Sequence, residues 1–289
     1  MPNLIDLRRR VRSVKNMQQI FRAMKMISAS RLRRSQEHIL ATRPYALQLR
    51  KVTQNLSAQA GEAEHPLLQV RPEEKVLLAV VSGDKGLCGS FNANLLRQAD
   101  LEIKRQSDKQ KLELLCLGKR ASDYYGRRTH TIRAAYKSLF RNVTYEQAQE
   151  IADDVQAAFI AGEYDAVYLI YNQFVSVMTQ TVTVERLLPL EPPSDEEADG
   201  GQSADYIYEP SASELLDVLL PRFVTFQVYR VLLESQAAEH AARMTAMDAA
   251  TKNAGELMDK LTLIMNRTRQ AAITTELIEV VSGASAMEG

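Results

Sequence analysis

The stretch RFVTFQVYRVLLESQAAEHAARMTAMDAATKNAGELMDKLTLIMNRTRQAAITTELIEVVS (residues 222–282) contains no proline and a single glycine, Gly255. A second run near the start of the chain, residues 3–43, contains neither glycine nor proline. At a rise of about 1.5 Å per residue, the longer run would form a helix roughly 90 Å long, beyond the ~50 Å diameter expected of a compact domain of this chain length. We therefore expect the two ends to form a rod of packed helices, with a smaller body between them.

The N-terminal run has an apolar stripe at steps of three or four residues, which is typical of one strand of a two-stranded coiled coil. Its members are Leu4, Leu7, Val11, Val14, Met17, Phe21, Met24 and Ile27. Proline lacks the backbone N–H and restricts the residue before it. We therefore expect Pro44 to kink or restart the N-terminal helix, and Pro221 to interrupt the C-terminal one.

The C-terminal run is rich in small side chains. Of its 41 residues from 235 to 275, 18 are Ala, Ser, Thr or Gly. Small side chains let two helices approach closely, so we expect a slim rod in which Ala241 and Ala249 are tightly packed. Such a rod buries little apolar surface per turn and gains stability from a surrounding partner. The end of the run is apolar, at Leu277, Ile278, Val280 and Val281, so we expect a partner to enclose it.

The middle of the chain alternates between strand and helix patterns. Strands are predicted at residues 76–82, 112–117, 166–171 and 176–187, and helices at residues 92–105 and 144–162. Thr144 and Gln147 have the spacing of a capping box at the start of the second helix. Short strand and helix alternation favours an α/β domain with a largely parallel sheet and covering helices.

The formal net charge is zero, but the charges are unevenly distributed. Residues 1–50 contain twelve Lys or Arg against two acids, Asp6 and Glu37, a balance of +10. The twelve are Arg8, Arg9, Arg10, Arg12, Lys15, Arg22, Lys25, Arg31, Arg33, Arg34, Arg43 and Arg50. Such a helix suits an acidic protein surface, a phosphate backbone or anionic lipid, unless it is simply a solvated face. A coiled-coil protein that binds nucleic acid therefore stays open as an alternative.

No catalytic or cofactor site stands out. The turn with Gly83, Gly86 and Gly89 lacks both glycine-rich phosphate-binding spacings, which favours a structural turn over the site of a nucleotide-dependent oxidoreductase. The histidines do not have metal-ligand spacing, and we expect neither a metal nor a cofactor. Cys88 and Cys116 lack a CxxC spacing and lie in apolar surroundings, so we expect reduced core thiols. No apolar stretch approaches the ~20 residues that span a bilayer.

Several long motifs resemble the gamma subunit of F-type ATP synthase, and together they cover nearly the whole chain. They are RRRVRSVKNMQQIFRAMKMISASRLRR (residues 8–34), SGDKGLCGSFN (82–92), LLPL (187–190), YIYEP (206–210) and EHAARMTAMDAATKNAGELMDKLTLIMNRTRQAAITTELIEVVSGA (239–284). The resemblance implies a central Rossmann-like α/β domain inserted between long terminal helices that form an antiparallel, left-handed coiled coil. The corresponding domains are an N-terminal shaft helix (1–60), an α/β foot (70–210) and a C-terminal shaft helix (211–289).

By this resemblance the chain is a non-catalytic rotor shaft inside a ring of alpha and beta subunits. The foot would meet the epsilon subunit and the membrane c-ring, and ion-driven rotation would change the nucleotide affinity of the beta catalytic sites. The implied location is peripheral, at the cytoplasmic face of a bacterial plasma membrane, without membrane insertion or nucleic acid. The loop EPPSDEEADGGQSAD after LLPL has no cysteine, so a thiol switch is not expected. Since the family motif begins almost at residue 4, the resemblance leads us to expect no removable presequence and a bacterial source.

The resemblance also assigns contact residues. Those implied to meet the alpha and beta ring are Met24, Lys25, Arg269, Gln270, Thr274, Glu276, Leu277, Ile278 and Val281. Those implied to meet the c-ring or epsilon are Tyr206, Tyr208 and Glu209. For each of them, ordinary coil packing or solvent exposure is the alternative.

Overall fold

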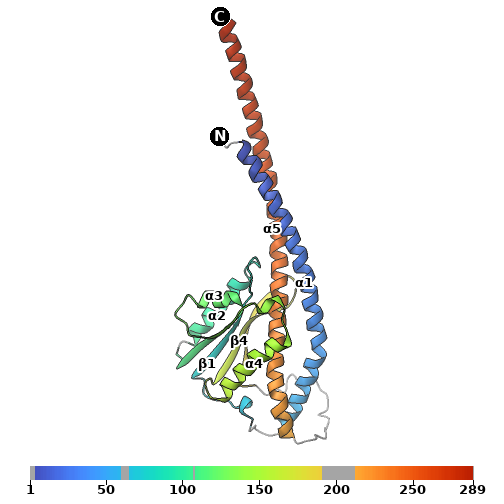
Figure 1. Cartoon of the computed structure of the whole chain (residues 1–289), viewed down its shortest axis with the longest axis vertical. Coiled ribbons are helices and arrows are strands. Elements are labelled where there is room, and N and C mark those ends of the chain that lie inside the picture. Colours follow the sequence, from blue (N-terminus) through green and yellow to red (C-terminus); the bar gives the residue numbers. More distant parts are fainter. Residues whose placement is uncertain (1–3, 60–64, 107, 191–211, 289) are drawn as a thin grey trace. The chain divides into compact units, whose positions relative to one another are not determined.

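A computed structural model describes residues 4–59, 65–106, 108–190 and 212–288 of the chain (Figure 1). Two long helices dominate it, α1 (Leu4–Gln59) and α5 (Ala212–Glu288). The structure divides into two compact units. The helical unit comprises Met1–Ser28 and Met244–Gly289, and the sheet unit comprises Ala29–Arg243. Both long helices contribute to both units.

The two long helices pair in opposite directions. Within the helical unit, the Gln18 side chain donates to the carbonyl oxygen of Thr251 at 3.3 Å, and Lys25 Nζ lies 2.6 Å from Asp248 Oδ1. Rising residue numbers on α1 thus match falling numbers on α5. Within the sheet unit, Ser35 Oγ donates to Gln236 Oε1 at 3.1 Å. The prediction of an antiparallel helix pair is confirmed.

The buried seam of α1 differs in part from the predicted apolar stripe. Met17 and Ile27 are 43% and 54% exposed, so their assignment to the seam is wrong. The buried and half-buried positions instead follow a seven-residue repeat. The positions of this repeat are Leu7, Val11, Val14, Gln18, Phe21, Lys25, Ser28, Leu32 and Ser35, and half-buried residues such as Leu4 and Met24 lie beside it. A period of 3.5 residues is typical of a left-handed supercoil. The seam therefore includes polar residues, which a search for apolar positions alone does not find.

The prolines do not break the helices. Pro44 lies inside α1 and Pro221 lies inside α5, so the expected restart and interruption are wrong. A proline removes one backbone hydrogen bond and costs a helix about 3 kcal/mol. At Pro221 the neighbouring side chains of Leu220 and Val224 are completely buried, and Thr225 Oγ1 donates to the Pro221 carbonyl at 3.0 Å. Burial on both sides of the proline holds the helix together.

The sheet unit contains a five-stranded sheet in the order β3-β2-β1-β4-β5. Its strands are β1 (Lys75–Val81), β2 (Lys111–Leu117), β3 (Ile132–Tyr136), β4 (Ala166–Phe174) and β5 (Gln180–Leu188). Its helices are α2 (Phe91–Arg105), α3 (Lys119–Tyr125), α4 (Tyr145–Ile160) and the 3-10 turns η1 (Pro66–Leu68) and η2 (Leu139–Arg141). Only the β4–β5 pair is antiparallel among these described strands. The predicted parallel α/β domain is confirmed, including the capping box at Thr144, whereas α3 and β3 were not predicted.

Helices cover both faces of the sheet, and the central strand β1 shows how. Alternate side chains of β1 point to opposite faces. Leu77, Ala79 and Val81 pack in a core with α4 and α5, while Val76 and Val80 pack in a second core with α2 and α3. Burial on both faces explains why the sequence of β1 is apolar throughout.

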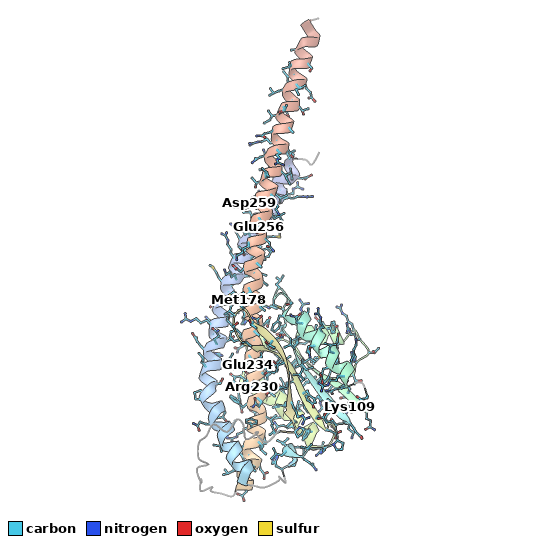
Figure 2. All side chains as sticks on the ribbon, turned by 180° about the vertical axis from the view of Figure 1, so that it is seen from behind. Lys109, Met178, Arg230, Glu234, Glu256 and Asp259 are labelled. Atoms are coloured by element: carbon cyan, nitrogen blue, oxygen red, sulfur yellow. The ribbon has the colours of Figure 1, made fainter. Side chains whose placement is uncertain are left out.

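A half-buried charge cluster joins α5 to the sheet. Arg230 Nη2 donates to both carboxylate oxygens of Glu185 on β5, at 2.6 and 2.8 Å, and Arg230 Nη1 donates to Glu234 at 3.1 Å. The Tyr171 hydroxyl on β4 also donates to Glu185, at 2.8 Å. Figure 2 shows Arg230 and Glu234 on the part of α5 that lies along the sheet. The bidentate geometry fixes the orientation of the helix on the strands as well as its position.

The packing of α5 can be tested at two alanines. Ala241 is completely buried, while Ala249, which was expected to be tightly packed as well, is exposed. Ala241→Leu should lower the free energy of unfolding by roughly 1 to 3 kcal/mol, because added methylenes overpack a filled site. Ala249→Leu adds the same atoms to the same helix and serves as the matched control. Urea unfolding measures both variants. Equal losses in the free energy of unfolding would contradict the tight packing of Ala241.

Candidate interaction surfaces and the glycine turn

The C-terminal part of α5 is an exposed helix. Every residue from 271 to 284 is exposed, whereas positions up to Thr268 still include half-buried ones. Ile273, Leu277 and Val280 are 49%, 61% and 70% exposed. With Val281, they follow the i, i+4, i+7, i+8 spacing of one helix face. A continuous apolar stripe on an exposed helix is a candidate surface for a protein partner.

Most of the ring contacts implied by the resemblance lie on this same stretch of α5. Arg269, Gln270 and Glu276 are exposed, as are Leu277, Ile278 and Val281. Thr274 is exposed too, and its hydroxyl donates to the Gln270 carbonyl at 2.9 Å. We name residues 269–284 the terminal segment. The structure therefore brings seven of the nine residues onto one accessible segment.

Met24 and Lys25 lie elsewhere. Both are half-buried on α1, and the Lys25 ammonium is already paired with Asp248. Asp248 precedes Arg269 by 21 residues, or about 30 Å along a helix. Met24 and Lys25 therefore lie apart from the terminal segment, where α1 and α5 pair. Tyr206, Tyr208 and Glu209, the expected foot contacts, lie outside the described residues.

The basic residues of α1 mostly face solvent. Arg8, Arg9, Arg12 and Arg22 are exposed. In the described part of the basic set, Lys25 and Arg33 form ion pairs, with Asp248 and Glu37 respectively. Exposed cations on the described part of α1, such as Arg8, Arg9 and Arg12, could contact an acidic surface.

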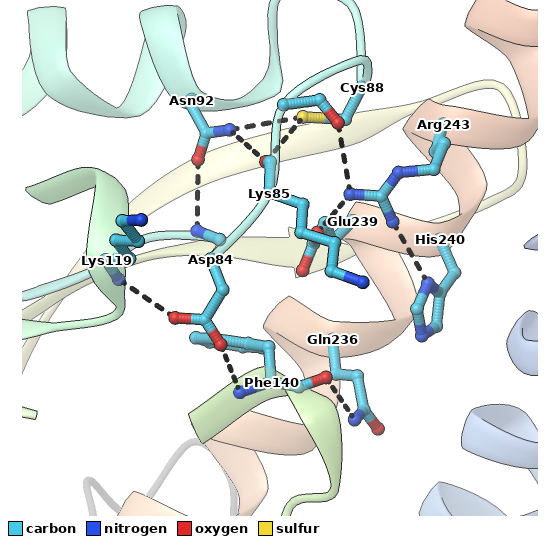
Figure 3. A network of polar contacts seen from close by, with 12 residues as sticks. Asp84, Lys85, Cys88, Asn92, Lys119, Phe140, Gln236, Glu239, His240 and Arg243 are labelled. Atoms are coloured by element: carbon cyan, nitrogen blue, oxygen red, sulfur yellow. Dashed lines mark hydrogen bonds and ion pairs between the residues drawn. The ribbon is translucent and has the colours of Figure 1, made fainter. Parts of the chain in front are cut away.

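The glycine turn after β1 packs against α5. A side chain at Gly83 would place its Cβ only 3.0 Å from Glu239 Cδ, so glycine is what lets this carboxylate approach. Arg243 Nη2 donates to Glu239 Oε1, and the same Nη2 also donates to the Gly86 carbonyl, at 3.4 Å. Figure 3 shows these side chains beside the turn. The predicted structural turn agrees with this packing, because the protein's own carboxylate fills the space at Gly83.

Asp84 and Asn92 hold the turn from within. The Asp84 carboxylate accepts from the backbone N–H groups of Lys119, Ser138 and Phe140, at 2.9, 3.0 and 2.9 Å. Asn92 Oδ1 accepts from the Gly83 N–H at 3.0 Å. These bonds connect the turn to the first residue of α3 and to η2 (Figure 3). The turn is thereby fixed from several elements of the sheet unit.

Burial shifts the pKa values of the titratable groups here. It raises the pKa of Glu239 above its ordinary value, although Arg243 acts in the opposite direction. Burial, with Arg243 and Arg31 nearby, lowers the pKa of His240 to about 4. Arg243 Nη1 lies 3.4 Å from His240 Nδ1. Because a guanidinium can only donate, this contact favours the neutral form of His240, with Nδ1 as the acceptor.

The cysteines behave as the sequence predicts. Cys88 and Cys116 are free and buried. Burial raises the pKa of both thiols, that of Cys116 to about 11. A thiol with a raised pKa is a poor nucleophile and metal ligand. Among the described residues, no group of three or more His, Cys, Asp or Glu side chains is arranged to hold a metal ion.

Sequence reasoning missed the contact between Glu239, Arg243 and the glycine turn. The available signal was the i, i+4 spacing of an acid and a base within an otherwise small-residue stretch, which in a sequence is typical of a solvated pair. Their exposures of only 3% and 7% reveal a buried pair instead.

The fold and these surfaces define a class of protein: an α/β domain inserted between two antiparallel helices, one of which ends in an exposed apolar segment. A family model described as ATP synthase matches residues 3–287. The ATP synthase gamma chain of Pelotomaculum thermopropionicum is 47% identical over 288 residues, and that of Solibacter usitatus is 49% identical over 292 residues. Each match covers 100% of both chains. This chain therefore belongs to the ATP synthase gamma chain family.

Solved structures agree on the fold. One neighbour is a chain in the structure of Euglena gracilis mitochondrial ATP synthase, OSCP/F1/c-ring, with a TM-score of 0.71, 19% identity and coverage of 98% of this chain and 94% of that chain. Another belongs to the central stalk and c-ring structure of Tetrahymena thermophila mitochondrial ATP synthase, with a TM-score of 0.62, 26% identity, and coverage of 80% and 99%. The described helices include none with a stretch both long and apolar enough for a membrane span.

The buried His240 makes a pH dependence testable. Its pKa is about 4 when folded, against 6.5 as the ordinary value. The unfolded chain therefore binds a proton that the folded chain does not, and the free energy of unfolding should fall by roughly 3 kcal/mol as the pH drops from 6.5 to 4. In His240→Gln this loss should be smaller, while His38→Gln, an exposed histidine on α1, should keep it. Urea unfolding at several pH values would measure this loss. An identical pH dependence of the free energy of unfolding in the wild type and both variants would contradict the role given to His240.

Proposed function

We propose that this chain is the central rotor shaft of an F-type ATP synthase, which couples ion-driven rotation of a c-ring to the catalytic sites of the beta subunits. The observation that carries the proposal is the terminal segment: an exposed helix with an apolar stripe, at the end of a long helix pair. A soluble protein gains nothing from such a stripe unless a partner encloses it. A ring of alpha and beta subunits, the partner that the sequence resemblance implies, would enclose such a stripe.

The shaft acts through differences between its faces. On the terminal segment, Ile273, Leu277 and Val280 form an apolar face, whereas Glu276 and Glu279 supply charge elsewhere on the same turns. Three beta subunits around one such helix would each meet a different face. Because a partner shifts a conformational equilibrium only by its differential contact energy, the three catalytic sites then differ in nucleotide affinity at any moment. Rotation exchanges these differences among them, and this chain itself carries out no chemical step.

The charge distribution supports the same arrangement. The exposed cations of α1, such as Arg8, Arg9 and Arg12, fit acidic loops on the surrounding subunits. Charge attraction of this kind favours correct assembly. A nucleic acid would also suit the cations, but it offers nothing for the apolar stripe.

The remaining parts follow from this assignment. Residues 70–210 serve as the foot, where the epsilon subunit and the c-ring attach, and residues 1–60 and 211–289 serve as the shaft. Tyr206, Tyr208 and Glu209 belong to the foot contact. The protein then lies at the cytoplasmic face of a bacterial plasma membrane as a peripheral subunit, without a cofactor of its own.

Co-purification tests the proposal directly. The chain is expressed with the ATP synthase alpha and beta subunits of the same genome, and the recovered complex is assayed for ATP hydrolysis with and without it. We expect one copy per ring and activity that depends on its presence. A correctly folded ring that excludes the chain would contradict the rotor assignment. Salt-dependent binding to nucleic acid would then support the alternative function.

Arg269 offers a sharper prediction. Arg269→Ala should lower the ATP turnover of the coupled complex while leaving the unfolding of the chain unchanged, because its side chain is exposed in the free protein. Arg267→Ala changes an equally exposed arginine two residues away, on a different face of the helix, and should retain turnover. Equal turnover in wild type and Arg269→Ala would show that the proposed contact is dispensable, and equal losses in both variants would show a general charge effect.

A further inference from the structure

The strand order places the glycine turn at a special point of the sheet. The chain leaves β1 and builds β2 and β3 on one side, whereas β4 and β5 lie on the other side of β1. β1 and β4 are parallel neighbours. The chain leaves β1 toward β2 on one side and later returns from β3 to β4 on the other side, so the strand order changes direction between β1 and β4. In open α/β sheets, ligands bind in the crevice beyond the carboxyl ends of the strands at this position.

In this protein α5 occupies that position. Gly83 follows the end of β1, and the Glu239 carboxylate lies against it, with both oxygens 3.2 Å from where a Cβ would stand. A glycine that permits close approach, followed by a helix, is the arrangement with which nucleotide-binding folds accept a phosphate. Here an internal carboxylate, itself paired with Arg243, takes the place of that anion.

The contact has both polar and apolar parts. Arg243 donates to Glu239 and to the Gly86 carbonyl, so it joins the helix to the backbone of the turn. Beside it, Cys88 and Phe91 pack with Ala238 and Ala242 of α5. Gln236, one turn earlier on α5, donates to the Phe140 carbonyl and accepts from Ser35 of α1. The turn is thus linked to both long helices within the sheet unit.

We propose that Gly83, Gly86, Glu239 and Arg243, named here the turn joint, fix the angle of the α/β domain on α5 and transmit torque between them. The inference rests on the proposed rotor function. Apolar packing along α5 resists separation of the domain but is non-directional. The charge-assisted bonds of the turn joint are directional, and Arg243 is the last residue of the sheet unit on α5. Glu239 and Arg243 are accordingly positioning residues, which act through the placement of the domain.

The test uses the full chain assembled in the alpha and beta ring. A gold nanorod attached at Asp108→Cys, on the surface of the α/β domain, reports the domain's angle; the native cysteines are buried. The measured quantity is the angular width of each dwell during ATP-driven rotation at limiting ATP. Glu239→Ala should broaden the dwells while leaving the ATP hydrolysis rate without load unchanged. Lys252→Ala is the matched control, since it removes an i, i+4 pair with Asp248 on the same helix at an exposed site.

Two further variants distinguish a positioning role of the turn joint from a purely structural one. Glu239→Gln preserves volume and removes the charge, so it should broaden the dwells less than Glu239→Ala. Gly83→Ala enters the turn joint from the opposite side, against the Glu239 carboxylate, and should broaden them as well. A purely structural role would lower the yield of complex but leave normal dwells in the complexes that form. Dwells of wild-type width in assembled Glu239→Gln and Gly83→Ala complexes would overturn the turn joint.

The same experiment separates this inference from the proposed function. If the chain with Asp108→Cys alone fails to enter the ring, or enters it without rotating on ATP, the rotor function itself fails and the turn joint fails with it. If that chain rotates normally and the Glu239 and Gly83 variants match Lys252→Ala, only the turn joint is wrong.

Discussion

The close antiparallel approach of α1 and α5 is the constraint on which the rest of the structure depends. It combines a seam with a seven-residue repeat on α1 with small side chains on α5, and most of the stability of helices in proteins comes from such packing rather than from helix propensity. Ser28 and Ser35 in the seam show that closeness matters here as much as apolar area. Because both ends of the chain are committed to this pairing, the residues between them must fold as a domain attached to the helices.

Along α5 the surroundings of the helix change while its backbone continues. Leu220, Val224 and Leu232 are buried against the sheet and α4, where large side chains fill the core. Ala238 and Ala242 follow, where the glycine turn comes close. The terminal segment is apolar again, but exposed. One helix therefore connects a domain core, a tight polar contact and a surface for a partner, as a shaft that transmits force between two assemblies would require.

Sequence patterns predicted the features that rest on local or periodic chemistry. The apolar run of β1, the capping box at Thr144 and the two long helices follow from composition and spacing. The family motifs also located the terminal segment. The missed features depend on tertiary packing: α3 begins where Asp84, far away in sequence, accepts the Lys119 N–H, and buried neighbours keep Pro221 helical. Met17 and Ile27 were misplaced because an apolar stripe and a strict heptad drift apart after a few turns.

The central claim is that the terminal segment is a contact surface completed by a ring of partner subunits. Hydrogen exchange of residues 271–284, measured in the free chain and in its complex with the alpha and beta subunits, tests it most directly. A solvent-exposed helix end opens easily, so we predict rapid exchange in the free chain and strong protection in the complex. Equally rapid exchange in both states would mean that nothing encloses the segment, and would contradict the account.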